Sequence, residues 1–437
     1  MFDAHIVAVD VADLEHGMYI TRLDRPWSET SFLIQGFKVE SDKELEQLQA
    51  QCRYVYVDVD RSSKGEGARH AGGRVYASLR QRRAVDLPAE EGSSRDLRFR
   101  HNDVSVGELL FPHRKLRLYS DTVSINAEMP VARAAYEDLR AATQQLMDGY
   151  RKSQSLDIRE VSDKLKPVTE SIIRNPDACS WLARIKSAED YACTHSVACV
   201  VWAVTLGRQL GLPKVELQKL ALGSLLFDIG KVKVPEELIA KPGSLNKLEF
   251  KLMRSHVEFG LELLNEAGVN SASVLQMVEH HHERYAGHGY PKGLQAEEIP
   301  EFARIAAIVD CYDAITSPRL YAKPMSPSDA AKSLMAWRDI DFQAELVEEF
   351  IQCIGIYPAG TLVELSSGEV GIVYGEYRTR RLRPLLMMVL DSDRKPLPEL
   401  RKLDLTKQTK TKDGKPLEII TSLVPGSYGI DLQAISL

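Results

Sequence analysis

The stretch Leu225-Leu-Phe-Asp-Ile-Gly-Lys231 places an aspartate, Asp228, between an apolar run and a glycine. Four further groups of metal-ligand residue types lie at nearly even distances along the chain: His195, His256, the run His280–His282, and Asp310. Counted through His281, the successive gaps are 33, 28, 25 and 29 residues. A helix of about four turns with a connecting loop has this length. The spacing therefore predicts a helical bundle in which each helix brings one ligand to a common centre.

The surroundings of these residues support the same hypothesis. His195 and Asp310 each lie in an apolar run that is typical of a buried helix, where an unpaired polar side chain is costly. His256 follows Leu248 and Leu252 on one stripe of an amphipathic segment, residues 247–260, so we expect all three to face the core. Three successive histidines cannot share a helix face, because neighbouring side chains are about 100° apart.

Taken together, these residues resemble the HD-GYP family of bacterial cyclic di-GMP phosphodiesterases. The resemblance covers roughly residues 181–354 and is carried by a series of motifs in the family's order: His195, Asp228-Ile-Gly-Lys231, His256, His281-His282-Glu283-Arg284, Gly287-His288-Gly289-Tyr290-Pro291 and Asp310-Cys-Tyr-Asp313. The series is specific because several motifs agree in both order and spacing.

The resemblance implies one or two divalent metal ions, iron or manganese, in an all-helical domain. It assigns as metal ligands His195, Asp228, His256, His281, His282 and Asp310. It gives Asp228 and Lys231 catalytic roles, and it assigns contacts with cyclic di-GMP to Arg284, Gly289, Tyr290, Pro291, Arg319 and Lys323. An intact family member would hydrolyse the substrate by in-line attack of an activated water on phosphorus. For Lys231, Arg319 and Lys323, a solvated surface charge is the alternative.

Three positions depart from the family pattern. The residue before Asp228 should be histidine and is Phe227, which has no lone pair to donate. Losing even an outer-shell partner typically costs roughly 10- to 100-fold in metal affinity, so we expect one metal site to be weakened at least that much. The alternative is that another residue or water replaces the imidazole. Tyr191 stands where members with a third metal have glutamate, and Ala286 replaces an aspartate in the loop, so we expect that loop to lack a polar anchor.

The remaining chain predicts a multi-domain, mainly α protein. We expect a small α/β module at residues 1–60, a basic linker at 61–125, the helical HD-GYP domain at 126–354 and a β-rich appendage at 355–437. Ser41 and Glu44 form a predicted capping box in the first module. Residues 61–100 contain ten basic against five acidic side chains, which indicates a solvated linker or, as the alternative, a site for an acidic partner.

The net charge and the cysteine content limit the classes of partner that we expect. The chain has 437 residues, a formal net charge of -6 and six cysteines without a Cys-x-x-Cys pair. We therefore expect a cytoplasmic protein with reduced, buried thiols, no membrane span and no nucleic-acid partner. Protein partners at the N-terminal module or the linker, and a homodimer, are further expectations.

Two function classes follow from these features. One is a phosphodiesterase whose hydrolysis is weakened or lost at Phe227. The alternative is a cyclic di-GMP receptor or interaction scaffold without catalysis. A related hydrolase acting on another nucleotide is a third interpretation, which the Gly289-Tyr290-Pro291 motif disfavours.

Overall fold

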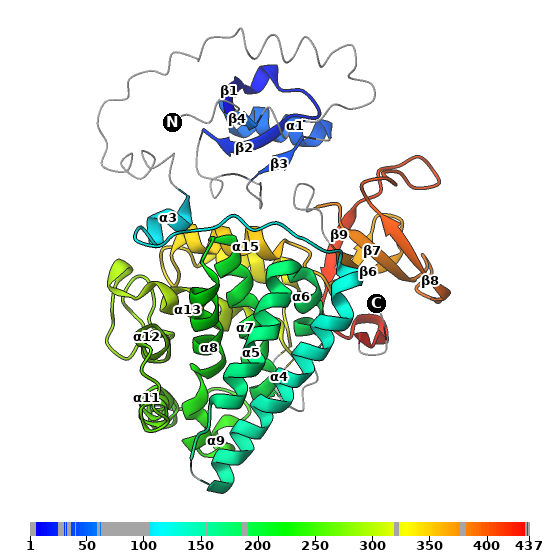
Figure 1. Ribbon diagram of the computed structural model, residues 1–437. Coiled ribbons are helices and arrows are strands. Elements are labelled where there is room, and N and C mark those ends of the chain that lie inside the picture. Colours follow the sequence, from blue (N-terminus) through cyan, green and yellow to red (C-terminus); the bar gives the residue numbers. More distant parts are fainter. Residues whose placement is uncertain are drawn as a thin grey trace, which may run out of the picture. The chain divides into compact units, whose positions relative to one another are not determined.

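The computed structural model describes residues 6–24, 30, 32, 36–39, 41–58, 62, 105–153, 155–185, 191–318, 323–375, 382–432 and 435. The chain forms two compact units, and the boundary between them lies at Ser105 and Val106. The expected fold class is confirmed: a helical core is accompanied by a small α/β module and a C-terminal sheet (Figure 1).

The first unit is a four-stranded antiparallel sheet with one helix. Its elements are β1 (Ile6–Asp10), β2 (Tyr19–Leu23), β3 (Phe37–Lys38), α1 (Asp42–Gln51) and β4 (Tyr54–Asp58), and the strand order is β1-β4-β2-β3. Side chains alternate along β4, so that Val55 and Val57 are fully buried against Leu48 of α1. The predicted capping box is present: Ser41 Oγ accepts from the Glu44 amide, and the Glu44 carboxylate accepts from the Ser41 amide.

The second unit is built on helices. In chain order they are α3 (Val106–Leu110), α4 (Ile125–Ser153), α5 (Arg159–Arg174), α6 (Pro176–Arg184), α7 (Tyr191–Gln209), α8 (Lys214–Leu226), η4 (Ile229–Lys233), α9 (Glu236–Ile239), α10 (Lys247–Arg254), α11 (His256–Glu266), α12 (Ala272–His280), η5 (Ala296–Glu298), α13 (Glu301–Thr316), α14 (Pro327–Ala336) and α15 (Ala344–Ile354). Helix α7 is buried from Cys193 to Arg208 and is packed by α8, α13, α6 and α15. Among the helices of the described residues, none is both long enough and apolar enough to cross a bilayer.

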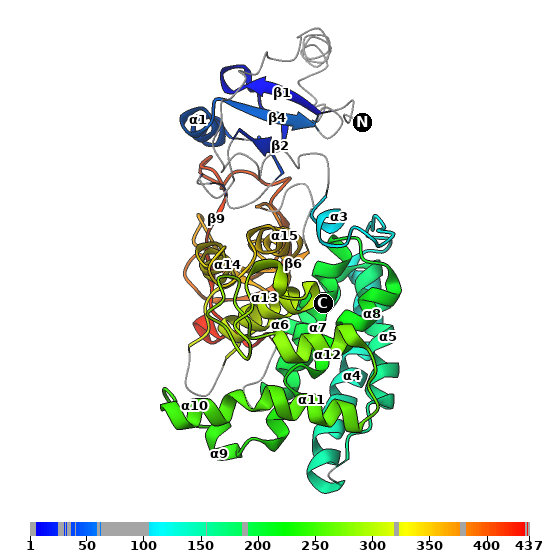
Figure 2. The same cartoon turned by 90° about the vertical axis from the view of Figure 1, so that its left-hand side faces the viewer.

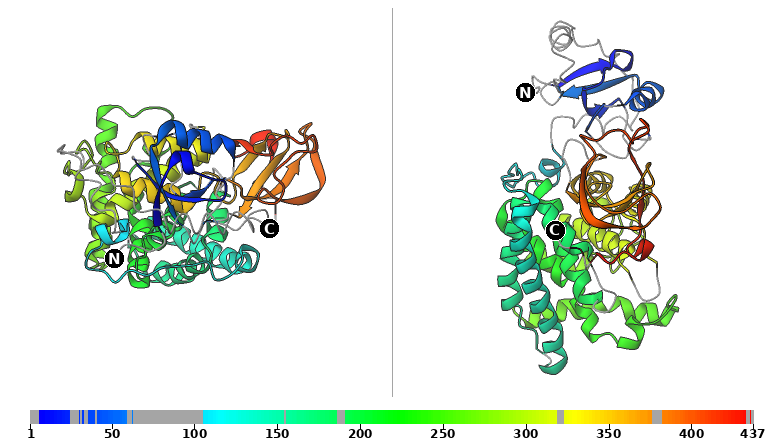
Figure 3. Two further views of the ribbon diagram at one scale, coloured as in Figure 1. Left: turned by 90° about the horizontal axis from the view of Figure 1, so that it is seen from above. Right: turned by 90° about the vertical axis from the view of Figure 1, so that its right-hand side faces the viewer.

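A five-stranded antiparallel sheet completes this unit. Its strands are β5 (Leu362–Leu365), β6 (Val370–Gly375), β7 (Leu385–Leu390), β8 (Pro396–Asp404) and β9 (Ile419–Leu423), in the order β8-β7-β6-β5-β9. Figure 3 shows the sheet, in orange and red, as a curved layer beside the helices. Strand β9 contacts α14, where Ser422 Oγ and Ser328 Oγ are 2.6 Å apart.

Two expectations about segment boundaries need correction. The predicted single helix over 247–260 breaks at Ser255 into α10 and α11. Leu248 of α10 is 81% exposed, so it does not face the core with the buried His256. The predicted linker is shorter than 61–125, because residues 106–125 belong to the helical unit and Phe111 is buried there. The other predicted domain limits stay predictions.

Candidate metal centre

Asp228 lies where α8 gives way to η4, with its carboxylate turned into the helical unit. The glycine two residues later allows this turn to touch α11. A Cβ atom on Gly230 would lie 1.9 Å from the His256 carbonyl oxygen, so only glycine fits. The Asp-Ile-Gly sequence thus brings Asp228 next to the start of α11.

Four donors meet at this point. Asp228, His256, His281 and His282, here called the three-histidine group, each offer a ligand atom, and these atoms all lie within 4.8 Å of one another. His256 Nδ1 donates to the Met253 carbonyl at 2.7 Å, and His281 Nδ1 donates to the Val278 carbonyl at 3.0 Å. A carbonyl only accepts, so in each neutral imidazole the Nε2 atom carries the lone pair.

The lone pairs of this group converge. The two Nε2 atoms are 3.3 Å apart, and they lie 3.4 Å and 3.6 Å from Asp228 Oδ1. Asp228 Oδ1 is buried and has no hydrogen-bond partner among the described residues. Three acceptors facing one another without a donor are unfavourable unless a cation lies between them. Imidazole nitrogens with one carboxylate suit iron, manganese or zinc, so these residues fit a divalent ion.

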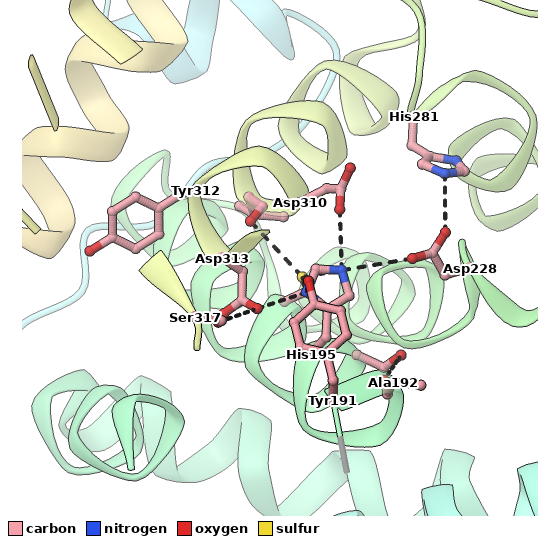
Figure 4. Close-up of polar contacts among 12 residues, drawn as sticks. Tyr191, Ala192, His195, Asp228, His281, Asp310, Tyr312, Asp313 and Ser317 are labelled. Carbon is pink, nitrogen blue, oxygen red and sulfur yellow. Dashed lines mark hydrogen bonds and ion pairs between the residues drawn. The ribbon is translucent and has the colours of Figure 1, made fainter. Parts of the chain in front are cut away.

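A second set of donors shares the same aspartate. His195, Asp228 and Asp310, here called the His195 group, also place ligand atoms within 4.8 Å of one another. His195 Nε2 lies 3.1 Å from Asp310 Oδ1 and 3.7 Å from Asp228 Oδ2. Figure 4 shows His195 between these two carboxylates, with Asp313 on its other side.

Asp313 orients His195. Its Oδ2 lies 2.7 Å from His195 Nδ1, and its carboxylate also accepts hydrogen bonds from Trp202 Nε1 and Ser317 Oγ. A carboxylate on the second imidazole nitrogen fixes the ring and makes the other nitrogen a better ligand.

The pKa values of His256 and His282 are shifted in the opposite direction to that of His195. Burial lowers the pKa of His256 to about 4, although Asp228 opposes the shift, and burial together with His281 lowers the pKa of His282 well below its usual range. Both rings are therefore neutral at pH 7, the form that binds metal. For His195, burial acts to lower the pKa, but Cys199, Tyr191 and the hydrogen bonds with Asp310 and Asp313 raise it overall.

Phe227 occupies the space between the two groups. Its side chain is 1% exposed, its ring stacks on His281 at 4.8 Å between centroids, and it meets His195 edge-on at 6.2 Å. A phenyl ring supplies packing but no donor atom. The His195 group consequently has three donors where the three-histidine group has four.

Lys231 forms an ion pair with the carboxylate of Asp228, which the two groups share. Its Nζ lies 2.5 Å from Asp228 Oδ2, on the oxygen that does not face His256 and His281. Burial acts to raise the pKa of Asp228, but Lys231 and the neighbouring imidazoles hold it well below its usual range. Asp228 is therefore a carboxylate at neutral pH.

Comparison with known proteins adds an independent finding. Residues 174–344 match the model of the HD domain, and residues 6–161 match a domain of unknown function, DUF3391. Cyclic di-GMP phosphodiesterase PA4108 of Pseudomonas aeruginosa is 31% identical over 394 residues, which are 90% of this chain and 87% of that protein. The chain belongs to the HD-GYP family.

Other HD-GYP relatives match shorter parts of the chain. The cyclic di-GMP phosphodiesterase response regulator RpfG of Xanthomonas campestris is 30% identical over 249 residues, covering 53% of this chain and 66% of that protein. The 3'3'-cGAMP-specific phosphodiesterase 2 of Vibrio cholerae is 34% identical over 159 residues, covering 36% of this chain and 30% of that protein. HD-GYP proteins use divalent metals, and the two donor groups are the candidates here.

The loop that carries Gly287-His288-Gly289-Tyr290-Pro291, here called the HD-GYP loop, is anchored by Glu283. We predicted no role for this residue from the sequence. Glu283 is 1% exposed, and its carboxylate accepts hydrogen bonds from the backbone amides of Lys292 at 2.7 Å and Leu294 at 3.1 Å. The expectation that Ala286 leaves the loop without a polar anchor is therefore wrong. A buried glutamate directly before a glycine-rich loop is the signal that could have indicated this role.

The loop reaches the metal centre through Tyr290. Its ring stacks on His282 with centroids 4.6 Å apart. A Cβ atom on Gly289 would lie 2.3 Å from the Arg284 amide nitrogen, so the loop requires glycine there. Tyr290 thus borders the three-histidine group, and contact of Gly289, Tyr290 and Pro291 with substrate stays a prediction.

The basic residues expected at the substrate have different surroundings. The Arg284 side chain donates to the carbonyls of His281 and Glu283 and lies 3.7 Å from Asp341. Lys323 is exposed. Arg319 lies outside the described residues. Their roles at the substrate stay predictions.

Proposed function

We propose that this chain binds cyclic di-GMP with one divalent ion in the three-histidine group, and that hydrolysis is weak or absent because Phe227 replaces a ligand. The observation that carries the proposal is the buried Phe227 ring between His195 and His281. The His195 group therefore has one donor fewer than the three-histidine group, and the apolar phenyl ring occupies the space where a fourth ligand would lie.

The surviving residues have definite roles in this proposal. Asp228, His256, His281 and His282 would hold the ion, which when bound supplies Lewis-acid polarisation of a phosphate oxygen and a lowered pKa for a nearby water. Lys231 keeps the Asp228 carboxylate ionised and offers a cation beside it. Asp313 fixes the orientation of His195.

Receptor function without catalysis is the second candidate. The observation that favours it is the loop, which Glu283 holds in place beside His282 although a ligand of the metal centre is missing. Binding needs a shaped surface and one cation, whereas in-line hydrolysis by two cations also needs the second site. Relatives named as cyclic di-GMP and 3'3'-cGAMP phosphodiesterases support a cyclic dinucleotide as the ligand.

Metal content and turnover together test the proposal. The full chain would be purified without chelators, loaded with manganese or iron, and analysed for metal per chain and for cyclic di-GMP remaining after incubation. We expect about one metal per chain, with cyclic di-GMP bound and almost entirely intact. Two metals per chain and steady production of the linear dinucleotide would overturn the proposed loss of hydrolysis.

A further inference from the structure

Helix α10 carries apolar side chains that the helical unit does not bury. None of its eight residues is buried, and Leu248, Phe250 and Leu252 are 81%, 46% and 41% exposed. Asn246 caps its first turn, and Lys241 binds Glu249 at 2.6 Å, so the helix is ordered by its own polar contacts. Figure 2 shows α10 at one end of the helical unit, next to α9 and α11.

Two residues of α10 turn toward the HD-GYP loop. Phe250 and Arg254 are four residues apart, and both meet the Tyr290 ring. The Arg254 guanidinium carbon lies 4.3 Å from the centre of that ring, and the Phe250 ring meets it edge-on at 6.1 Å. Because Tyr290 stacks on His282, the cation and the phenyl ring adjoin the three-histidine group.

Arg254 is a cation without a carboxylate. No Asp or Glu of the described residues lies within ion-pair distance of it. By contrast, Lys241 pairs with Glu249, and Arg284 pairs with Asp341. The guanidinium lies over the Tyr290 ring, and among the described residues no acceptor takes a hydrogen bond from its N–H donors. The edge of a guanidinium is suited to a ligand with two neighbouring acceptor atoms.

Guanine has those two acceptors. Its O6 and N7 atoms accept a bidentate pair from arginine, whereas adenine presents N7 as an acceptor and N6 as a donor. Unpaired nucleobases are commonly held by hydrogen bonds to that edge and by contact with aromatic rings. The half-exposed Phe250 ring offers the apolar contact beside the guanidinium.

We infer that Arg254 and Phe250 of α10, with Tyr290, form a nucleobase subsite in which Arg254 selects guanine over adenine. The inference rests on the proposed binding of a cyclic dinucleotide at the three-histidine group. One phosphate lies at the metal in this arrangement, and one base extends toward α10. Arg254 is then a specificity-determining residue, and it takes no part in breaking the phosphodiester bond.

Binding of three ligands to the manganese-loaded full chain tests the inference. Dissociation constants for cyclic di-GMP, 3'3'-cGAMP and cyclic di-AMP would be measured by calorimetry. We expect the wild type to prefer guanine, and Arg254→Met to weaken cyclic di-GMP about tenfold, in line with the discrimination of a bidentate arginine. Binding of cyclic di-AMP stays unchanged in this variant. Arg254→Gln shifts preference toward adenine, because glutamine matches the N6 and N7 pair.

Controls separate the possible failures. Lys251→Met removes an exposed charge from the same helix and leaves all three constants unchanged. Phe250→Ala weakens all three ligands alike. If Arg254→Met weakens every ligand equally, or none, the inference is wrong while the proposed function stands. A wild-type chain that binds no cyclic dinucleotide overturns both. Metal content, measured for each variant, shows whether the metal site is intact.

Discussion

At the scale of single residues, the Phe227 ring limits the number of donor atoms at the candidate metal centre. Phe227 gives the core a well-packed side chain at a place where the HD-GYP pattern has an imidazole. Stacked on His281 and set edge-on to His195, it stabilises the arrangement of both histidines. The ring thus holds both histidines in place without itself supplying a donor atom.

Phe227→His should restore the second metal site. The imidazole would add a fourth donor to His195, Asp228 and Asp310. We expect metal content to rise from about one to about two per chain, and cyclic di-GMP turnover to rise by roughly 10- to 100-fold, the range seen when ligand support is altered. Plasma emission analysis and a product assay measure the two quantities.

Phe227→Leu is the matched control for that variant, because leucine also removes the phenyl ring but supplies no lone pair. Its metal content should equal that of the wild type. A Phe227→His protein that still holds a single metal would show that other positions limit the second site.

Glu283→Ala should loosen the HD-GYP loop. It leaves the amides of Lys292 and Leu294 without their acceptor in a partly buried place. Hydrogen bonds to a charged group contribute about 1.5–3 kcal/mol, so the free energy of unfolding should fall by an amount in that range. Chemical denaturation measures it. Glu279→Ala removes contacts with Lys292 Nζ at 2.7 Å and with His280 Nε2 at 3.2 Å but leaves both loop amides bonded, so it should cost less than Glu283→Ala. Equal losses in the two variants would refute the anchoring role.

The sequence predicted which polar side chains gather at the centre better than it predicted their surroundings. His195, Asp228, His256 and Asp310 are residue types that an apolar helix rarely carries without a partner, so each could be singled out and placed by its spacing. The contacts of Glu283 and Arg254 depend on how the loop and α10 meet in space. No periodicity encodes that contact. The place of Glu283 directly before a glycine-rich loop was one signal of its role, whereas the role of Arg254 could not be read before the fold was known.

At the scale of elements, α4 and α5 are joined by a buried ion pair. Glu128 of α4 is 3% exposed, and Arg174 at the end of α5 donates to both of its oxygens, at 2.6 Å and 2.8 Å. Burial acts to raise the pKa of Glu128, but the hydrogen bonds from Arg174 and Ser171 lower it overall.

Glu128→Gln should destabilise the protein in a pH-dependent way. A lowered pKa in the folded state stabilises the fold above the ordinary glutamate value of 4.5, and this contribution is lost as the pH falls through the folded pKa. We expect a loss of about 1.5–3 kcal/mol at pH 7, and a smaller difference from the wild type below pH 4.5. Denaturation at pH 7 and pH 4 measures it.

The control for this pair is Glu137→Gln, on the same helix but half exposed beside Arg140. It should change stability little at either pH. A constant difference between Glu128→Gln and the wild type at both pH values would mean that the ion pair contributes nothing through its charge.

The helix boundaries show where sequence periodicity is insufficient. An apolar residue every three or four positions predicted one helix through Leu248, Leu252 and His256, and the hydrophobic stripe is real. The chain turns at Ser255, however, so His256 begins a separate helix and α10 points its stripe to solvent. A serine without glycine or proline beside it gives no breaking signal.

At the scale of the whole molecule, metal binding should stabilise the fold. The three-histidine group joins the end of α8, the start of α11 and the end of α12, so an ion held there links three elements. A ligand at 100 times its dissociation constant adds about 2.7 kcal/mol to stability. Manganese should raise the melting temperature of the chelator-treated chain, as differential scanning fluorimetry would show.

His281→Ala should abolish that rise, whereas His280→Ala should keep it. His280 is buried beside Glu279 and Glu283 and belongs to none of the donor sets found among the described residues. Its variant can melt at a lower temperature than the wild type and still respond to manganese. A rise retained in His281→Ala would place the ion elsewhere.

The C-terminal sheet also constrains the order of folding during synthesis. Strand β5 pairs with β6 on one side and with β9 on the other, so its second edge stays open until residue 423 has left the ribosome. The helices that carry the two donor groups are complete more than 100 residues earlier, by Thr316. The nascent helical core can therefore assemble while β5 is still an uncovered edge strand, a template for unwanted pairing. Emergence of residue 423, with Ser422 docking on Ser328, ends that interval.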